Sequence, residues 1–478
     1  MVLWIGVDDT DSLQGMCTTF LATEIVRDLT EDFDLIGYPR LVRLNPNIPW
    51  KTRGNGAVCM RFGEGVGRPF VVGSIAGRPI QAYSRGRTIS EQAAVADRIA
   101  PLVERWSRFD DSTTNPAFAV LRGQPTPTLY WRAVRGVVSK RSAKASARGL
   151  GVVRSYKNGR GLIGALAAIA WRPRDRTYEI LTYRALEAWS TERRIAPESV
   201  IRMDHDFPST FNNYDYANDR AVIAPRSPCP ILFGIRGDDP AVLPAAMSII
   251  DGERPERWLI FETNQGTDDH VMSRASPRPH LTVRLEGDVS SLPRVLAGGH
   301  VVVRVGPIDI TAYEPSKQFR SVVRNLLPGD RVIAMGAVRA SPATLNLEKL
   351  CVVSAVSVVR KVSNPLCPAC GKRTKSLGRS AGFRCPRCRT LVPRDAAQWE
   401  AVERPLAPGW YEPPVGSRRH LSMPIKRMLR SSPAAHPIHV GLAAQAREAL
   451  LRDLRGTSPM PLGTGLLNSE ARDPETGL

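Results

Sequence analysis

The stretch that decides the fold is Asp8-Asp9-Thr10-Asp11-Ser12-Leu13-Gln14-Gly15-Met16-Cys17-Thr18-Thr19. The apolar run from Val2 to Val7 before it predicts a buried strand, and residues 20–29 after it have helical apolar spacing. Two hydroxyls thus stand where a helix begins, and helix N-terminal amides suit phosphate. Three neighbouring acids favour Mg²⁺, which prefers acidic and phosphate oxygens. The stretch predicts a phosphoryl-transfer site with an acceptor hydroxyl, although Asp and Thr are also ordinary turn and cap residues.

The length of 478 residues allows roughly three or four domains. The longest apolar run, Leu162 to Trp171, is too short to span a bilayer and predicts a buried helix. No signal-peptide pattern follows the first methionine. We therefore expect a cytoplasmic protein with no membrane partner.

The charge balance is strongly basic, with 66 Lys and Arg against 46 Asp and Glu and a net charge of +20. Only ten of these bases are lysine. Arginine pairs bidentately with phosphate and stacks on bases, so this excess favours a nucleic-acid partner. A GC-rich genome also enriches arginine, so charge alone leaves the partner open.

Four cysteines form two knuckles, Cys367-Pro-Ala-Cys370 and Cys385-Pro-Arg-Cys388, with 14 residues between them. This spacing predicts a tetrahedral zinc site, which is structural because four thiolates leave no open position. Cytosolic thiols stay reduced, which disfavours two disulfides. The other cysteines, Cys17, Cys59, Cys229 and Cys351, are scattered and predict buried core positions.

Bases surround the knuckles and predict a face that binds phosphates, although a solvated surface gives the same pattern. They are Lys372, Arg373, Lys375, Arg379, Arg384, Arg387 and Arg389. Residues 279–360 alternate short apolar runs with turns, as in an OB-type barrel that binds single strands, and other small barrels share this pattern. The tail, 401–478, contains one possible amphipathic helix, Val440 to Arg455, and a polar end that we expect to be disordered.

Residues 1–278 mix strand and helix patterns. We expect a helix from Ser90 to Phe109 with Ser90 as its N-cap, and strands at Thr128–Trp131 and Tyr178–Tyr183. Gly159–Ala165 opens a second helix with glycines and Arg160, which makes it a candidate anion site.

Three further clusters are too polar and glycine-rich for a core. In Asn45–Gly56, Lys51, Arg53 and the glycine amides are suited to close around phosphates. Phe233–Asp238 places one base between glycines, and Thr263–His270 combines amides, hydroxyls and paired acids. Each cluster alone fits a turn, but their joint occurrence favours a site.

These motifs resemble the archaeal tRNA(Ile) 2-agmatinylcytidine synthetase family, TiaS, over residues 1 to about 425. The resemblance rests on Val7–Ser12, Gly15–Thr19, Arg43–Gly56, Phe233–Gly237, Thr263–Asp268 and the order of barrel and ribbon. It implies a multidomain α+β protein. Its parts are a kinase-like α/β N-terminal domain (1–126), a ferredoxin-like α+β domain (127–278), an OB-type β-barrel (279–360) and a zinc ribbon (361–400). A return of the chain to the first domain near 230–278 stays open.

The resemblance also implies the reaction. ATP phosphorylates the carbon-2 oxygen of the wobble cytidine in a tRNA(Ile) with a CAU anticodon, and agmatine displaces the phosphate. The product, agmatidine, allows AUA decoding, and ATP ends as AMP. Phosphorylation is needed because a cytosine carbonyl oxygen is a poor leaving group.

By its motifs, the resemblance gives Asp8, Asp9 and Asp11 catalytic roles, with Asp8 and Asp11 holding Mg²⁺, and makes Thr18 an autophosphorylated hydroxyl. The residues expected at the ATP phosphates are Thr19, Lys51, Arg53, Gly54 and Gly56. Agmatine carries an amine and a guanidinium and needs acids. Candidates on sequence grounds alone are Asp215, Asp238, Asp268 and Asp269.

The chain departs from the family at Met423, where a base is expected, and matches nothing beyond about residue 430. Two alternatives stay open. A nucleic-acid-binding protein built on the barrel and ribbon, without catalysis, leaves the acids at 8–11 and Thr18 unexplained. A polynucleotide kinase or ligase is the other, but the Lys-x-Asp-Gly motif of nucleotidyl-lysine ligases is absent.

Overall fold

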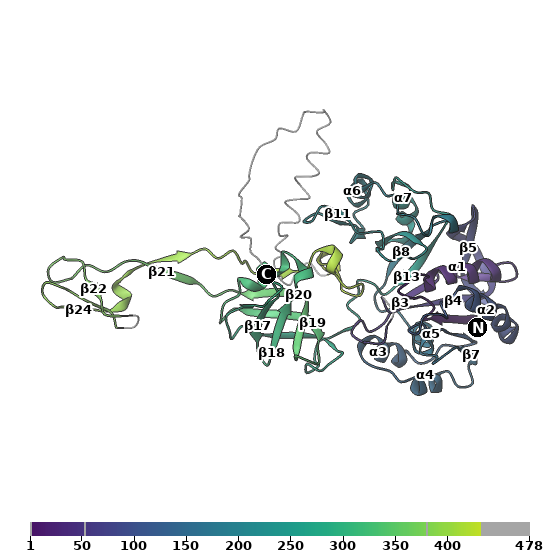
Figure 1. Ribbon diagram of the computed structural model, residues 1–478, viewed down its shortest axis with the longest axis horizontal. Helices are drawn as coiled ribbons and strands as arrows, with labels where there is room; N and C mark the ends of the chain where they lie inside the picture. Colours follow the sequence, from purple (N-terminus) through teal and green to yellow (C-terminus); the bar gives the residue numbers. More distant parts are fainter. Residues whose placement is uncertain (1, 52–53, 379–380, 432–478) are drawn as a thin grey trace, which may run out of the picture. The chain divides into compact units, whose positions relative to one another are not determined.

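Strand β1 (Leu3–Asp8) lies inside a mixed sheet and is covered on both faces (Figure 1). It pairs antiparallel with β4 (Gly56–Ile75) and β6 (Ala117–Leu121). Because side chains alternate across a strand, Leu3, Ile5 and Val7 enter one core while the strand's other face meets helix α5. This two-sided burial explains the continuous apolar run. The structure is a computed structural model that describes residues 2–51, 54–378 and 381–431.

The sheet runs in the order β7-β6-β1-β4-β3-β13-β8-β12-β9, with β2 and β5 paired to β4. Its remaining strands are β2 (Asp34–Ile36), β3 (Arg40–Arg43), β5 (Arg78–Arg87), β7 (Gly151–Ser155), β8 (Thr177–Tyr183), β9 (Thr210–Phe211), β12 (Ile231–Gly237) and β13 (Arg257–Thr263). Strand β13 pairs parallel with β3 and antiparallel with β4 and β8. One sheet therefore contains strands from both of the first two predicted domains, whose boundary stays a prediction.

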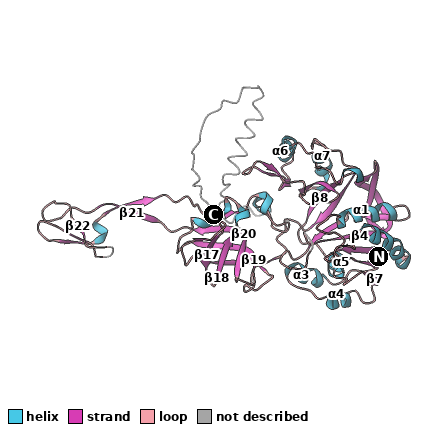
Figure 2. Ribbon diagram, viewed as in Figure 1, coloured by secondary structure: helices cyan, strands magenta, loops and turns pink. Residues whose placement is uncertain are grey.

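Helices cover the two faces of this sheet (Figure 2). Helices α1 (Thr18–Leu29) and α2 (Gln92–Trp106) pack into one core. Helices α3 (Pro127–Arg135), α4 (Lys140–Ser146) and α5 (Gly161–Ala170) pack into the other. Small side chains on this second face, such as Ala57 and Ala119, let α5 approach closely.

The predicted first strand, the helix after Thr18, the helix at Gly161 and the strand at Tyr178 are confirmed. The strand predicted at Thr128–Trp131 is wrong, because these residues lie in α3. Ser90 is not the N-cap of α2, since Glu91 holds that position and makes no side-chain cap bond.

Beyond β8, helices α6 (Pro197–Asp206) and α7 (Leu243–Ser248) and a hairpin of β10 (Tyr214–Asp215) and β11 (Arg220–Ala221) complete this part. A second sheet follows with its own core. Its elements are β14 (Val271–Met272), β15 (Thr282–Asp288), β16 (Arg294–Val295), β17 (Val301–Val305), β18 (Ile308–Ala312), α8 (Phe319–Arg324), β19 (Arg331–Val338), β20 (Thr344–Ser354) and β26 (Gly409–Tyr411). Within the described ranges its strand pairings do not close into a ring, so the OB-type barrel stays a prediction.

Two small sheets belong to the cysteine region. They are β21 (Val358–Ser363) with β25 (Gln398–Val402), and β22 (Lys375–Ser376) with β23 (Phe383–Arg384) and β24 (Leu391–Val392). Helix α9 (Ile425–Ser431) follows. The helix expected at 440–455 and the expected disordered end lie outside the described residues. None of the helices in the described ranges has the length and apolarity that a membrane span needs.

Candidate active site

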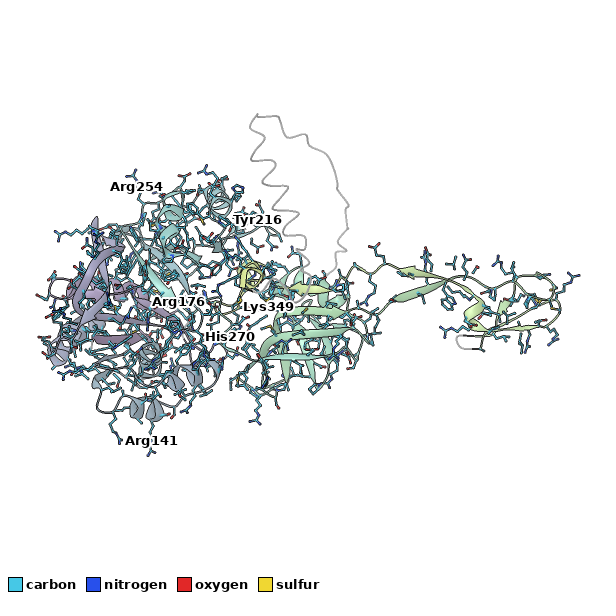
Figure 3. The ribbon with its side chains drawn as sticks, turned by 180° about the vertical axis from the view of Figure 1, so that it is seen from behind. Arg141, Arg176, Tyr216, Arg254, His270 and Lys349 are labelled. Atoms are coloured by element: carbon cyan, nitrogen blue, oxygen red, sulfur yellow. The ribbon has the colours of Figure 1, made fainter. Side chains whose placement is uncertain are left out.

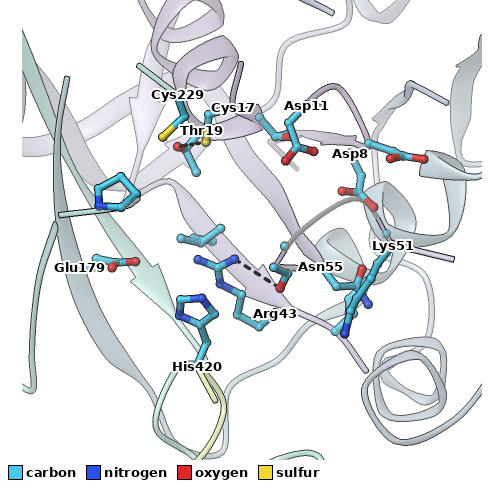
Figure 4. Close-up of a pocket in the computed structure, with 18 of the residues that line it drawn as sticks. Asp8, Asp11, Cys17, Thr19, Arg43, Lys51, Asn55, Glu179, Cys229 and His420 are labelled. Carbon is cyan, nitrogen blue, oxygen red and sulfur yellow. Dashed lines mark hydrogen bonds between the residues drawn. The ribbon is translucent and has the colours of Figure 1, made fainter. Parts of the chain in front are cut away.

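A cavity of about 330 Å³ opens at the end of β1, beside the first turn of α1 (Figure 4). Every predicted catalytic and phosphate-binding residue that the structure describes lines it. These are Asp8, Asp9, Asp11, Thr18, Thr19, Lys51, Gly54 and Gly56. Arg53, the remaining one, lies outside the described residues.

The carboxylates come from the end of β1 and the turn after it. Asp8 is half-buried beside Gly164 of α5, where an added Cβ would lie 1.8 Å from Asp8 Oδ2. Burial raises the pKa of Asp8, and the Asp9 and Asp11 carboxylates raise it further. Asp9 accepts a hydrogen bond of 3.3 Å from Arg160 at the start of α5. The backbone of Asp9 is left-handed, with φ of 59°.

This donor set fits Mg²⁺. Carboxylate oxygens are its preferred protein ligands, and crowded negative charge at Asp8 is the setting that a divalent cation relieves. The family resemblance assigns the ion to Asp8 and Asp11, while Asp9 pairs with Arg160 at 3.3 Å. The prediction of Mg²⁺ at these two acids stays a prediction.

The hydroxyls stand at the first turn of α1. Thr18 is the first residue of the helix, is buried, and accepts a hydrogen bond of 3.0 Å from Thr10 Oγ1. Cys17 holds the N-cap position without a side-chain cap bond, and its Sγ lies 3.0 Å from Thr19 Oγ1. The N-terminal end of α1, which favours anions, therefore borders the same cavity as the acids.

Lys51 brings a cation to the cavity lining. Its Nζ donates to the carbonyl of Pro46. Burial lowers the pKa of Lys51 to about 8, and the neighbouring Arg419 contributes to the shift. Arg419 also donates to the Pro46 carbonyl, at 3.3 Å. The predicted contact of Lys51 with a phosphate stays a prediction.

Gly54 and Gly56 pack against Arg43 of β3. A Cβ on either glycine would lie 2.7 or 2.8 Å from Arg43 Nη1. The structure therefore gives a packing reason for both glycines, besides the predicted role of their amides at phosphate. Asn264 fixes the backbone of Arg43 by accepting from its N–H at 2.7 Å and donating to its carbonyl at 2.8 Å.

Other charged side chains of the cavity come from segments distant in sequence. Glu179 of β8 and Arg236 of β12 form an ion pair of 2.8 Å. His420 lies beside Arg43, whose charge lowers the pKa of His420, and burial and Arg236 add to the effect. The glycine-flanked bases of the sequence point to Arg160 and Arg236. Glu179 gives no such signal, because it lies within an ordinary strand pattern.

Two cysteines predicted as core residues, Cys17 and Cys229, line the cavity. Cys229 is buried as predicted, and Arg193 donates to its carbonyl at 2.8 Å. Cys17 is only half-buried.

The four acids predicted for agmatine are absent from the cavity lining and have protein partners instead. Asp215 accepts from Asn218, and Asp238 pairs with Arg427 and Arg430. Asp268 pairs with Lys349 at 2.5 Å, and Asp269 accepts from Tyr130 at 2.5 Å (Figure 3 shows Lys349). The structure does not bring the four together, and their role with agmatine stays a prediction.

Comparison with known proteins identifies the family of this chain. Models of three TiaS domains match: the TCKD domain over residues 4–158, the FLD domain over 159–270 and the C-terminal zinc ribbon domain over 364–406. The tRNA 2-agmatinylcytidine synthetase TiaS of Methanocaldococcus jannaschii is 38% identical over 89% of this chain and 99% of that protein. That of Archaeoglobus fulgidus is 38% identical over 90% and 98%. The chain belongs to the TiaS family.

Solved TiaS structures share the fold. The complex of TiaS with its isoleucine tRNA and ATP matches with a TM-score of 0.76 and 36% identity over 90% of this chain and 98% of that one. The complex of TiaS with the same tRNA, AMPCPP and agmatine matches with a TM-score of 0.74 and 34% identity over the same shares. The family resemblance noted in the sequence is confirmed.

The zinc ribbon of this TiaS-family chain has its four cysteine sulfurs within 4.8 Å of one another. The Cys367–Cys388, Cys370–Cys385 and Cys370–Cys388 sulfurs are 3.4, 3.5 and 3.6 Å apart. Tetrahedral Zn–S bonds of about 2.3 Å place sulfurs about 3.8 Å apart, so the site fits Zn²⁺. The predicted structural zinc site is supported by both the geometry and the family match.

Proposed function

We propose that this chain is an ATP-dependent tRNA(Ile) 2-agmatinylcytidine synthetase. One observation carries the proposal: three acids, two helix-end hydroxyls and several bases line a single cavity in a chain that aligns with nearly the whole length of its TiaS relatives. A nucleic-acid-binding protein without catalysis would leave this cavity unexplained. The tRNA substrate puts the proposed reaction in the cytoplasm.

In the first step, the carbon-2 oxygen of the wobble cytidine attacks the γ-phosphoryl group of ATP. Lys51 and Arg160, which both line the cavity, neutralise the phosphate oxygens. The backbone amides in the first turn of α1 orient the phosphate groups. Mg²⁺ held by Asp8 and Asp11 would neutralise charge at the transferring group. Asp8 and Asp11 hold their carboxylates toward that region, and Asp9 fixes Arg160.

We propose that Thr18 is the autophosphorylated hydroxyl: its oxygen takes the β-phosphoryl group of the ADP left by the first step, AMP leaves, and water later releases the phosphoryl group as orthophosphate. Its Oγ1 already accepts a hydrogen bond from Thr10, so its own proton points elsewhere and is available to a neighbouring base. The carboxylates at 8–11 line the same cavity, and one of them can accept this proton.

In the second step, the primary amine of agmatine attacks carbon 2, and phosphate leaves with the former carbonyl oxygen. The amine must lose protons for this attack, which a cavity carboxylate can accept. For the guanidinium end we retain the four acids at 215, 238, 268 and 269 as candidates. Their present partners would have to yield to agmatine.

The modular assignments form part of the proposal. We assign residues 1–126 to a kinase-like domain, 127–278 to a ferredoxin-like domain and 279–360 to an OB-type barrel. The shared sheet supports the return of the chain to the first domain, because β13 pairs with β3 and β4. The barrel and the basic ribbon would hold the tRNA while the wobble base leaves its stack.

The test is incubation of the full chain with ATP, agmatine and a CAU-anticodon isoleucine tRNA transcript, followed by nucleoside mass spectrometry. We expect a cytidine heavier by agmatine minus water that appears only with ATP. Matched reactions with Asp11→Ala and with a GAU-anticodon transcript should give none. An unchanged cytidine, with the tRNA bound, would refute the proposed activity.

A further inference from the structure

Arg43 is a half-buried cation that forms no ion pair with a carboxylate of the cavity. Its Nε is buried and makes no hydrogen bond, and its Nη1 makes only a long bond of 3.4 Å to the carbonyl of Gly54. No ion pair joins Arg43 to an acid anywhere in the ranges that the structure describes. Loss of hydration lowers the pKa of Arg43, and the charges of Glu179 and Asp11 offset this shift only in part because neither acid is paired with it. Such a group is costly unless a ligand completes it.

Two further side chains face the same place. Arg236 donates its Nε to Glu179 at 2.8 Å, so that pair is neutral overall. Glu179 also accepts from Gln265, which holds the pair in position. His420 is neutral at pH 7, because Arg43, burial and Arg236 all lower its pKa, and it supplies one N–H donor. The cluster therefore carries one net positive charge.

The acids of the 8–11 stretch lie elsewhere in the cavity, whereas Glu179 is neutralised by Arg236 within the cluster. Figure 4 shows Arg43, Glu179 and His420 on one side and Asp8 and Asp11 on the other. The cavity is thus divided electrostatically into an acidic end and a basic end.

We propose that Arg43, with Arg236 and His420 beside it, binds a phosphate monoanion: the backbone phosphodiester of the RNA next to the nucleotide that enters the cavity. The assignment rests on the proposed function, which supplies the RNA substrate. It adds to that function a residue that positions the RNA backbone.

Three features favour a phosphodiester over the ATP phosphates. The single net positive charge of the cluster matches a phosphate monoanion. The more highly charged triphosphate of ATP needs Lys51, Arg160 and the N-terminus of α1, which lie beside the acids. His420 lines the cavity and is exposed to solvent, so a ligand can reach the cluster from outside. Trp50 and Val137 also line the cavity and are 54% and 52% exposed, which suits contact with a base or sugar at the mouth.

The glycines of the 45–56 loop belong to this arrangement. Gly54 and Gly56 leave the space that the Arg43 guanidinium fills, and a Cβ on Gly54 would also lie 3.6 Å from His420 Nε2. The absence of a Cβ at Gly54 therefore keeps the space between Arg43 and His420 open.

The first test needs no variant. Methylphosphonate linkages, which remove one phosphate charge each, are placed singly around the wobble cytidine of the tRNA, and binding to the wild-type chain is measured. We expect one linkage beside this nucleotide to raise Kd about tenfold or more, the loss of one charge-assisted hydrogen-bond set. Unchanged Kd for every linkage would overturn the proposal.

The second test uses Arg43→Gln, with Arg254→Gln as the matched control. Arg254 is exposed and makes no ion pair among the described residues (Figure 3). We expect Arg43→Gln to raise Kd for tRNA about tenfold, to change Kd for ATP less than about twofold, and to abolish the effect of the sensitive linkage. Weaker ATP binding with unchanged tRNA binding would assign the cluster to ATP and overturn the proposal.

If Arg43→Gln does not fold by circular dichroism, His420→Ala replaces it, with the same double-mutant comparison. All these readouts measure binding and need no turnover. If one methylphosphonate linkage weakens tRNA binding but no agmatidine forms, the proposed activity is refuted and the phosphate subsite is retained. If agmatidine forms but no linkage changes tRNA binding, the activity is supported and the phosphate subsite is refuted.

Discussion

Gly164 gives the acid end of the cavity its room. An added Cβ at this position would meet the Asp8 carboxylate at 1.8 Å, and its three nearest atoms all belong to the Asp8 side chain. Gly164→Ala should therefore displace Asp8 and lower kcat about 100-fold, because a misplacement of about 1 Å has this order of effect. Thermal stability should stay equal or rise slightly, since alanine favours a helix.

Gly6→Ala is the matched control for this change. Its Cβ would lie 2.2 Å from the backbone carbonyl of Ala165, which cannot rotate away. This variant should lose stability in thermal denaturation, in contrast to Gly164→Ala. A fully active Gly164→Ala protein would contradict the placement of Asp8 in the reaction.

The lowered pKa of Lys51 predicts that the use of ATP becomes less efficient at alkaline pH. Its pKa of about 8 means that the ammonium is fully charged below this pH and is lost as the pH rises through it. The kcat/KM for ATP reports the free enzyme and should fall above about pH 8, by up to tenfold per pH unit.

Lys51→Arg should remove this fall, because arginine keeps its charge. Lys144→Arg, a change at an exposed lysine, should leave the pH profile as it is. An alkaline limb that persists in Lys51→Arg would assign the limit to another group.

Single residues of the site were predictable where they are neighbours in the chain. The acids at 8–11 and the hydroxyls at 18–19 are recognisable because one strand-turn-helix unit carries them all. Glu179 gave no such signal, and Arg43 began a resemblance motif without a predicted role at the site. Their convergence depends on the order of β3, β13, β8 and β12 in the sheet, which pairs strands far apart in sequence.

At the scale of elements, the two zinc knuckles repeat one backbone pattern. Gly371 donates its N–H to Cys367 O, and Arg389 donates its N–H to Cys385 O at the same position of the second knuckle. Both residues are left-handed, with φ of 69° and 63°. Arginine has a steric cost there of about 1 kcal/mol that glycine avoids.

Arg389→Gly should therefore slow zinc release to a chelator, and Gly371→Ala should speed it, each by a few-fold. The wild-type chain should release one zinc ion. Zinc release that is equally fast in all three proteins would show that knuckle strain does not limit it.

Helix α3 shows why the element prediction failed at one place. The Leu129-Tyr130-Trp131 run has aromatic residues typical of strands, but Pro127 begins a helix at this point. The buried residues Tyr130 and Val134 are spaced at a helical interval and face the core beside α5. Tertiary packing on α5 overrides the local β preference.

At the scale of the molecule, α9 joins distant parts of the chain. Arg427 pairs with Asp175 and Asp238 and also donates to the Gly266 carbonyl at 2.9 Å. These two acids lie 252 and 189 residues earlier. Their separation explains why the acid at 238 was a ligand candidate: its arginine partners cannot be identified from a single sequence.

Arg427→Met should lower the free energy of unfolding by about 2 kcal/mol, because it leaves two partly buried acids without their main partner. Arg430→Met removes a more exposed arginine from Asp238 and should cost about 0.5 kcal/mol. Urea denaturation measures both. Equal effects would show that Arg427 acts only as a surface ion pair.

The division into modules, drawn from pattern and resemblance, stays a prediction. The sheet that contains strands from 3–8 through 257–263 was not predictable from the sequence. Its pairings depend on long-range register, for which short apolar runs carry no unique solution. The zinc site, in contrast, was fully predictable, because the spacing of its cysteines alone specifies the ligands.

The most direct test of the chemistry follows one oxygen atom. The wobble cytidine of the tRNA is labelled with ¹⁸O at carbon 2, and the full chain is incubated with ATP and agmatine. Activation of that oxygen by phosphoryl transfer, followed by displacement, predicts one ¹⁸O in released orthophosphate for each agmatidine formed. Label that stays in the RNA or passes to water while agmatidine forms would contradict the account.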